Sequence, residues 1–110
     1  MGSKVKTAEI LSKNKVKIRL TEERWKHIVN SHLELSAKDF SKIVNTIKHP
    51  DIVLKGDMGE LLAVRKKSGS RQYYVVPYKE LDGKDGFILT AYLTTDLRWL
   101  LQKEVIWNKK

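Results

Sequence analysis

The sequence has no cysteine, two prolines and no long apolar run. The lack of cysteine excludes a disulfide framework, a thiolate zinc site and a cysteine nucleophile. No apolar stretch approaches the roughly 20 residues of a membrane span, so no membrane partner is expected. The N-terminus has no hydrophobic segment typical of a secretory signal. We therefore expect a soluble, cytoplasmic protein. Its 110 residues, 41% apolar and 32% charged, are enough for one domain.

Acidic residues are few compared with basic ones. Asp and Glu total 13 and Lys and Arg total 22, which gives a net charge of +9. A small basic domain attracts polyanions, and nucleic acid is the usual one. The alternative is that the charge serves solubility alone.

The spacing of apolar residues predicts a strand, two helices and then a run of strands. Thr21 is the expected N-cap of the first helix, and Ser36 with Asp39 forms the expected capping box of the second, which Pro50 stops. The predicted strands are 16–20, 52–54, 61–66, 72–78, 87–94 and 105–107, and a short helix is predicted at 97–103.

This order predicts an α+β fold. We expect the N-terminal strand and two helices to pack on one face of a twisted antiparallel sheet of about four to five strands. The other face should stay open to solvent or ligand. Residues 1–14 are expected to be a basic flexible arm, 15–107 the single domain and 108–110 a basic tail. Pro77 inside a strand predicts an edge position or a bulge.

Alternation along the last long strand divides its side chains into two sets. Phe87, Leu89, Ala91 and Leu93 should face the helices, which leaves Thr90 and Tyr92 on the open face with Ile88 and Thr94. Arg65 is expected on the open face as well, because an unpaired arginine rarely enters a core. Arg65, Thr90 and Tyr92 therefore form a candidate polar site.

Three histidines offer general acid or base chemistry. His32 ends the apolar stripe of the first helix, where it is either a core-edge residue or a general acid or base. His27 lies on the polar face of the same helix. Its direction differs from that of His32 by about 140° around the helix axis, so the two histidines are not expected to chelate one metal. His49 suits a capping role. No cofactor or metal motif is present, and none is expected.

A cluster of basic and aromatic residues follows strand 61–66. Such a cluster can hold phosphates and stack bases, or it can be a solvated hairpin tip that protects an edge strand. The candidate nucleic-acid-binding residues are Lys66, Lys67, Arg71 and Tyr73, beside Arg65 and Tyr74.

Several short motifs follow one another along the chain: Trp25-Lys26-His27-Ile28 with Ser31-His32-Leu33-Glu34, His49-Pro50-Asp51-Ile52-Val53, Tyr73-Tyr74-Val75-Val76, and Gly86-Phe87-Ile88-Leu89-Thr90-Ala91-Tyr92. In this order they resemble small phage and prokaryotic domains of the barnase, EndoU, colicin and RelE-like ribonuclease superfamily. Two positions depart from the pattern, with Ser31 in place of the usual arginine and Leu33 in place of the usual proline.

The resemblance implies a nuclease-like domain at 15–107 and a metal-independent endoribonuclease, often a toxin. It also implies that the catalytic residues are His32, with His27 as its competitor, together with Arg65, Thr90 and Tyr92. RNA is then the expected partner. Two alternatives remain: a non-catalytic nucleic-acid-binding module, and an adaptor for an acidic protein such as an antitoxin or immunity protein.

Overall fold

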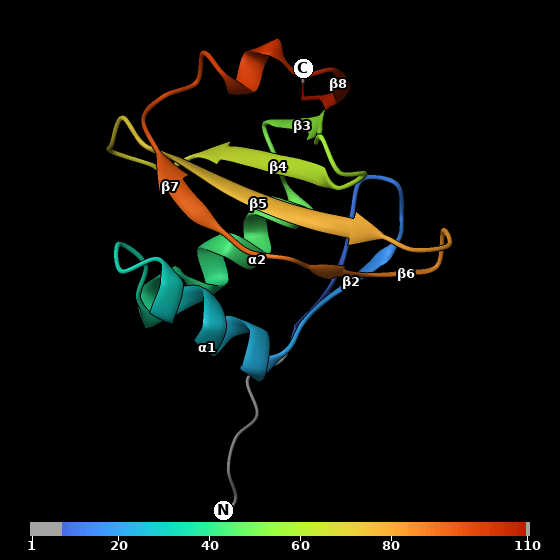
Figure 1. The fold of residues 1–110 in the computed structure, drawn as a ribbon, viewed down its shortest axis with the longest axis horizontal. Coiled ribbons are helices and arrows are strands. Elements are labelled where there is room, and N and C mark those ends of the chain that lie inside the picture. The colour runs from blue at the N-terminus through green and yellow to red at the C-terminus, as the bar shows by residue number, and fades with distance from the viewer. Residues whose placement is uncertain (1–7, 110) are drawn as a thin grey trace, which may run out of the picture.

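Two α-helices and eight strands are present in the computed structural model, which describes residues 8–109. Figure 1 shows the strands in one twisted sheet, with α1 and α2 packed together on one side of it. The α+β class is therefore confirmed. The elements are β1 (Ala8–Leu11), β2 (Lys17–Leu20), α1 (Glu22–Ser31), η1 (Ala37–Asp39), α2 (Phe40–Lys48), β3 (Ile52–Lys55), β4 (Leu61–Lys66), β5 (Tyr73–Glu80), β6 (Asp85–Ile88), β7 (Tyr92–Thr94), η2 (Leu100–Gln102) and β8 (Val105–Asn108).

The sheet is larger than expected, and it is mixed. Its strand order is β1-β2-β6-β5-β4-β3-β8, and β7 pairs with the first part of β5. Every neighbouring pair is antiparallel except β2 and β6, which run parallel. The expectation of four to five antiparallel strands is wrong because a long-range parallel pairing leaves no local signal in the sequence.

The expected flexible arm contains an ordered strand. Strand β1 pairs with β2, and Ile10 on it is buried against the core at 5% exposure. The arm prediction is therefore wrong for residues 8–14, and residues 1–7 lie outside the described part. At the other end Asn108 belongs to β8, and the Lys109 ammonium lies 2.9 Å from Asp51 Oδ1.

The start of α1 is as predicted, whereas α2 begins at Phe40, four residues after the predicted cap Ser36. The Thr21 side chain accepts a hydrogen bond from the Arg24 backbone N–H. Ser36 and Asp39 form the capping box, with a 3₁₀ turn between the cap and α2. Trp25 of α1 meets Phe40 of α2 edge to face at 5.2 Å between ring centroids, which joins the two helices.

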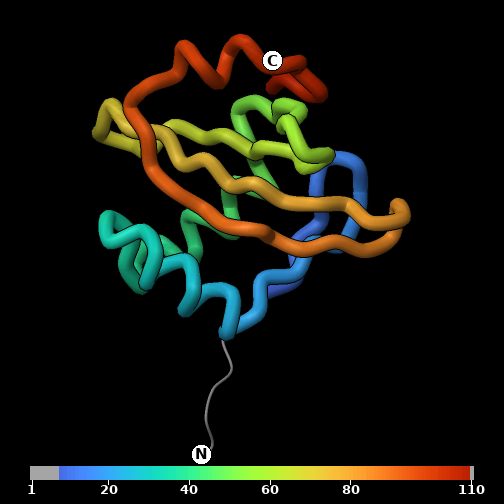
Figure 2. The backbone as a smooth tube through the Cα atoms, in the orientation of Figure 1, coloured from blue at the N-terminus to red at the C-terminus, as the bar shows by residue number. Residues whose placement is uncertain are grey.

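The predicted strand 87–94 is interrupted. Figure 2 shows the chain passing from β6 to β7 in one sweep along β5. Ile88 pairs with Tyr78 of β5, and Tyr92 pairs with Val75 of β5. The chain therefore advances four residues from Ile88 to Tyr92, while β5 advances only three over the same stretch. This extra residue is a bulge, and it lies beside Pro77, as one of the two interpretations of that proline predicted. The edge interpretation is wrong, because β5 has neighbours on both sides.

The bulge changes which side chains face the helices. Ile88 before it and Ala91 after it both enter the helix-side core, joined at its margin by Leu93. The prediction that Ile88 points away from the helices is therefore wrong, while the assignments of Ala91 and Leu93 are confirmed. Tyr92 lies on the other face, as expected, in register with Val75.

That other face is not open. It carries a second apolar cluster, in which Leu54, Leu62, Val64 and Val75 are covered by Leu100. The segment after β7 runs back across the molecule to β8 and supplies this cover (Figure 1). The predicted helix 97–103 is only a turn and the short η2, because a segment of this length gains little helical stability by itself.

Candidate functional site

His32 is fixed by the end of α1. It is the C-cap residue, its N–H donates to the Ile28 carbonyl at 2.9 Å, and its carbonyl accepts from the Leu35 N–H at 2.9 Å. These two bonds hold the backbone on both sides of the imidazole. The side chain is 31% exposed, so it is positioned by the protein and still reachable from solvent.

The imidazole of His32 stacks on the ring of Tyr92. The ring centroids are 5.9 Å apart and the planes meet at 29°. Tyr92 lies on β7, which pairs with β5 along one side, so the stack forms at the margin of the sheet. Partial burial, followed by the charge of Glu60, raises the pKa of Tyr92 above its ordinary value. The phenol is therefore protonated and can donate a hydrogen bond at neutral pH.

Glu34 connects the two sides of this site. Its Oε2 lies 3.7 Å from His32 Nδ1 and accepts a hydrogen bond from the Leu93 N–H at 3.4 Å. A carboxylate beside one ring nitrogen orients the imidazole. Glu34 was not among the predicted site residues. Its position two residues after His32, in the turn that leaves the helix, was the available signal.

A row of polar residues crosses three strands beside this stack. Lys66 of β4 pairs with Tyr73 of β5, which pairs with Thr94 of β7. Tyr92 is two residues from Thr94, so alternation puts it on the same face. Tyr73 and Tyr92 both border the second apolar cluster.

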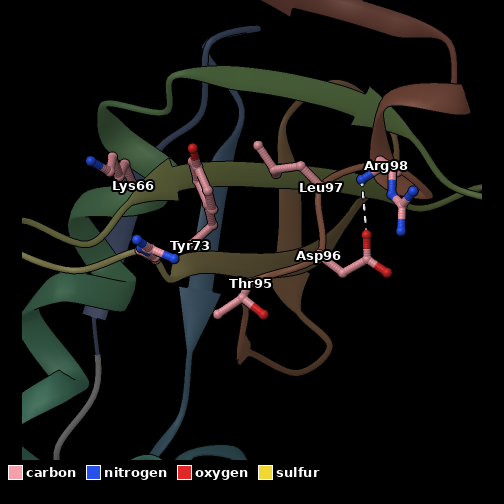
Figure 3. A pocket seen from close by; sticks show the side chains of 7 residues that line it. Lys66, Tyr73, Thr95, Asp96, Leu97 and Arg98 are labelled. Carbon is pink, nitrogen blue, oxygen red and sulfur yellow. Dashed lines mark hydrogen bonds between the residues drawn. The ribbon is translucent and has the colours of Figure 1, made fainter.

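The end of this row opens into a pocket of about 630 Å³. Figure 3 shows Lys66 and Tyr73 on one side of it and residues 95–98 on the other. Arg71 and Arg98 add positive charge to the lining, and Asp96 accepts a hydrogen bond from the Arg98 backbone N–H at 3.0 Å. We call this the hairpin pocket, because it lies at the turn end of the β4–β5 hairpin.

Arg65 is on the opposite face from the one predicted. It alternates with Ala63, which is fully buried in the helix-side core. An arginine can occupy this face because Arg65 lies at the margin of the helix-side core. There its Nη1 donates a hydrogen bond at 2.8 Å to the carbonyl of His49, at the end of α2. Arg65 and Tyr92 therefore do not share a sheet face, and the expected grouping of Arg65, Thr90 and Tyr92 is wrong.

Thr90 lies in the bulge between β6 and β7, two residues from Tyr92. It is partly exposed, and its hydroxyl has no hydrogen-bond partner within the described part of the chain. The bulge shifts its backbone out of the strand register in which the sequence pattern had placed it. Thr90 is thus near Tyr92 in the chain, without a contact that fixes its hydroxyl.

His27 is exposed on α1. It lines a shallow hollow with Thr21, Glu23 and Arg24. Across residues 8–109 its imidazole has no hydrogen bond, ion pair or ring contact. Only His32 is brought to Tyr92, so the two histidines have different surroundings and provide a matched pair for mutation.

The predicted basic cluster is divided between two faces. Lys66 and Tyr73 line the hairpin pocket with Arg71, whereas Arg65 and Tyr74 lie toward the helices. Strand β4 lies between β3 and β5, so the interpretation that these lysines protect an edge strand is wrong.

Comparison of the chain with protein-family models, curated proteins and solved structures finds no match. The site must therefore be interpreted from its own geometry. No group of three or more His, Cys, Asp or Glu side chains that could hold a metal occurs within residues 8–109. Over the same residues, no helix is both long and apolar enough to cross a membrane.

Proposed function

We propose that the protein is a metal-independent endoribonuclease, with His32 and Tyr92 at its reaction centre. One observation carries this proposal: the solvent-reachable imidazole of His32 stacks on the protonated phenol of Tyr92 at the margin of the sheet. The basic hairpin pocket lies on the same face of the sheet as Tyr92. The order of short motifs that resembles the barnase, EndoU, colicin and RelE-like superfamily supports the same reaction class. The charge of +9 suits a polyanionic substrate.

RNA carries its own nucleophile for this reaction. A base removes the 2′-OH proton, the 2′ oxygen attacks the adjacent phosphorus, and the bond from phosphorus to the 5′ oxygen breaks. The departing 5′ oxygen takes a proton from solvent water, and the base gives the proton that it removed back to solvent. Imidazole is a common general base in proteins, and His32 supplies it. The Tyr92 phenol donates a hydrogen bond to a phosphate oxygen as negative charge develops there.

The neighbouring cations serve the flanking phosphates. Lys66 and Arg71 in the hairpin pocket lie toward the same face as Tyr92, and their charges make RNA binding dependent on salt. Tyr73 offers a ring on which a base can stack. Arg65, which faces the helices, is not assigned to the reacting phosphate.

The test is cleavage of a labelled RNA in excess EDTA by wild type, His32→Ala and His27→Ala. We expect discrete cuts by wild type, at least a 100-fold loss in His32→Ala, and cleavage within about twofold of wild type in His27→Ala, because general base catalysis contributes roughly 10² to 10⁴ in rate. Binding of a non-cleavable 2′-deoxy oligonucleotide should be within a few-fold for all three. Full cleavage by His32→Ala would overturn the assignment, and binding without cleavage by wild type would favour the non-catalytic module.

A further inference from the structure

A second basic cavity lies on the helix side of the β4–β5 hairpin. Its volume is about 240 Å³. Lys42 of α2 borders it on one side, and Arg65, Lys66 and Lys67 border it on the other. Neither His32 nor Tyr92 lines it. We call it the α2 pocket.

The positive charges around this cavity are largely uncompensated. Across residues 8–109 the ammonium groups of Lys42, Lys66 and Lys67 make no ion pair or side-chain hydrogen bond. The Arg65 guanidinium donates to a neutral carbonyl, that of His49. Within the described part of the chain, no carboxylate lines the pocket.

Two carboxylates that bond to lining residues of this pocket are already engaged. Asp39 accepts hydrogen bonds from the Tyr74 hydroxyl at 2.6 Å and from the Ser36 N–H at 2.9 Å. Asp51 accepts from the Lys66 backbone N–H at 2.9 Å and from the Lys109 ammonium at 2.9 Å, although the charge of Arg65 also acts on it. Four cations therefore face a cavity without an anion of its own.

The remaining lining residues suit an oxyanion. Asn45 and Ser68 contribute an amide and a hydroxyl, both able to donate a hydrogen bond. The cavity has room for a phosphate group and several waters, since one water occupies about 30 Å³ in the liquid. A planar guanidinium with ammonium groups around it is a common way to hold phosphate.

We propose that the α2 pocket is a phosphate-binding site, separate from the reaction centre. Lys66 lines both this pocket and the hairpin pocket, so a single RNA strand that passes over the hairpin would meet cations on both faces of it. A small phosphorylated molecule would meet the same chemistry.

The first experiment is a titration of ¹⁵N-labelled protein with sodium phosphate at low ionic strength, with sodium chloride as the salt control. We expect saturable shifts of the Asn45 and Ser68 amide signals with phosphate. The double variant Lys42→Gln/Lys67→Gln should lose them, whereas Lys26→Gln/Lys48→Gln, which removes the same charge elsewhere, should keep them. Absence of saturable shifts in wild type, or equal loss in both double variants, would overturn the proposal.

The second experiment identifies the source of the phosphate. A single-stranded 2′-deoxy oligonucleotide has no 2′-OH, so the result does not depend on whether the protein cleaves RNA. If backbone phosphates occupy the site, Lys42→Gln/Lys67→Gln makes the negative slope of log affinity against log salt less steep than Lys26→Gln/Lys48→Gln does. The difference should be about 0.7 for each phosphate that the protein no longer neutralises. Phosphate shifts with an unchanged slope would assign the site to a small phosphorylated molecule.

Discussion

At the scale of single residues, one buried hydrogen bond joins the start of α2 to the sheet. The Tyr74 hydroxyl donates to Asp39 Oδ1 at 2.6 Å, and Asp39 also completes the capping box. Burial, followed by the hydrogen bond and charge of Asp39, raises the pKa of Tyr74 well above its ordinary range. The Tyr74 phenol therefore stays protonated at physiological pH and keeps the hydrogen that it donates to Asp39.

Tyr74→Phe should lower the free energy of unfolding by about 1.5–3 kcal/mol, the range for hydrogen bonds to charged groups. Tyr73→Phe is the matched control, because the Tyr73 hydroxyl has no hydrogen bond to the rest of residues 8–109. Its effect should lie within about 0.5 kcal/mol. Urea denaturation of the three proteins provides the comparison, and equal effects of the two variants would contradict this account.

Asp51 is a second residue with a strong environment. Partial burial raises its pKa, but the Lys66 N–H, the hydrogen bond and charge of Lys109, and the charge of Arg65 lower it by more. The pKa of Asp51 is therefore below its ordinary value of 3.8. A carboxyl with a lowered pKa in the folded state stabilises the protein above its unfolded-state pKa, and this stabilisation is lost as the pH falls through the folded-state value.

Asp51→Asn should thus be less stable than wild type at pH 7, and the difference should shrink as the pH falls below about 4. Unfolding free energies measured from pH 7 to about pH 2.5 test this, provided both proteins fold over the range. A difference that is constant with pH would show that Asp51 acts through packing or hydrogen-bond geometry and not through its charge.

At the scale of elements, the segment between β7 and β8 determines how much of the sheet is covered. Leu100 is fully buried against Leu54 and Val75, whereas its neighbour Leu101 is 57% exposed. The Leu101 N–H donates to the Leu97 carbonyl at 2.9 Å, and the Lys103 ammonium lies 3.2 Å from Asp57 Oδ1. Leu100, with Leu97 at the border of the cluster, thus holds the segment in place from inside, with polar contacts outside.

Leu100→Ala should lower the free energy of unfolding by about 2–5 kcal/mol, as expected for a buried leucine. Leu101→Ala removes the same atoms from an exposed position and should change it by less than about 0.5 kcal/mol. Chemical denaturation measures both. Similar losses in the two variants would mean that the segment does not pack on the sheet as described.

Elements with strong local signals were predictable. Thr21, Ser36 and Asp39 act as the predicted caps, and strand 61–66 has the predicted bounds. The faces after Pro77 were harder to predict, because one extra residue between Ile88 and Tyr92 changes which side chains point inward. Arg65 was misplaced for a different reason: it lies at the margin of the helix-side face, where the His49 carbonyl accepts its hydrogen bond, and alternation along a strand does not reveal such a partner.

At the scale of the whole molecule, the strand order brings the described parts of the two chain ends into one sheet. Strand β1 lies at one end of the order and β8 at the other. The parallel pairing of β2 with β6 links segments about 70 residues apart in the sequence. Neither this pairing nor the packing of residues 97–100 over the second apolar cluster leaves a periodic pattern in the sequence. Charge, in contrast, was readable from composition alone, and both basic pockets lie beside the β4–β5 hairpin.

The most direct measurement is the chemistry of the RNA ends produced in excess EDTA. Attack by the neighbouring 2′ oxygen leaves a 2′,3′-cyclic phosphate on one fragment and a 5′-hydroxyl on the other. We expect these ends from wild type, none from His32→Ala, and no cleavage where a 2′-O-methyl group replaces the hydroxyl at the cut site. Fragments with 3′-hydroxyl and 5′-phosphate ends, or cleavage that requires a divalent metal, would contradict the proposed reaction.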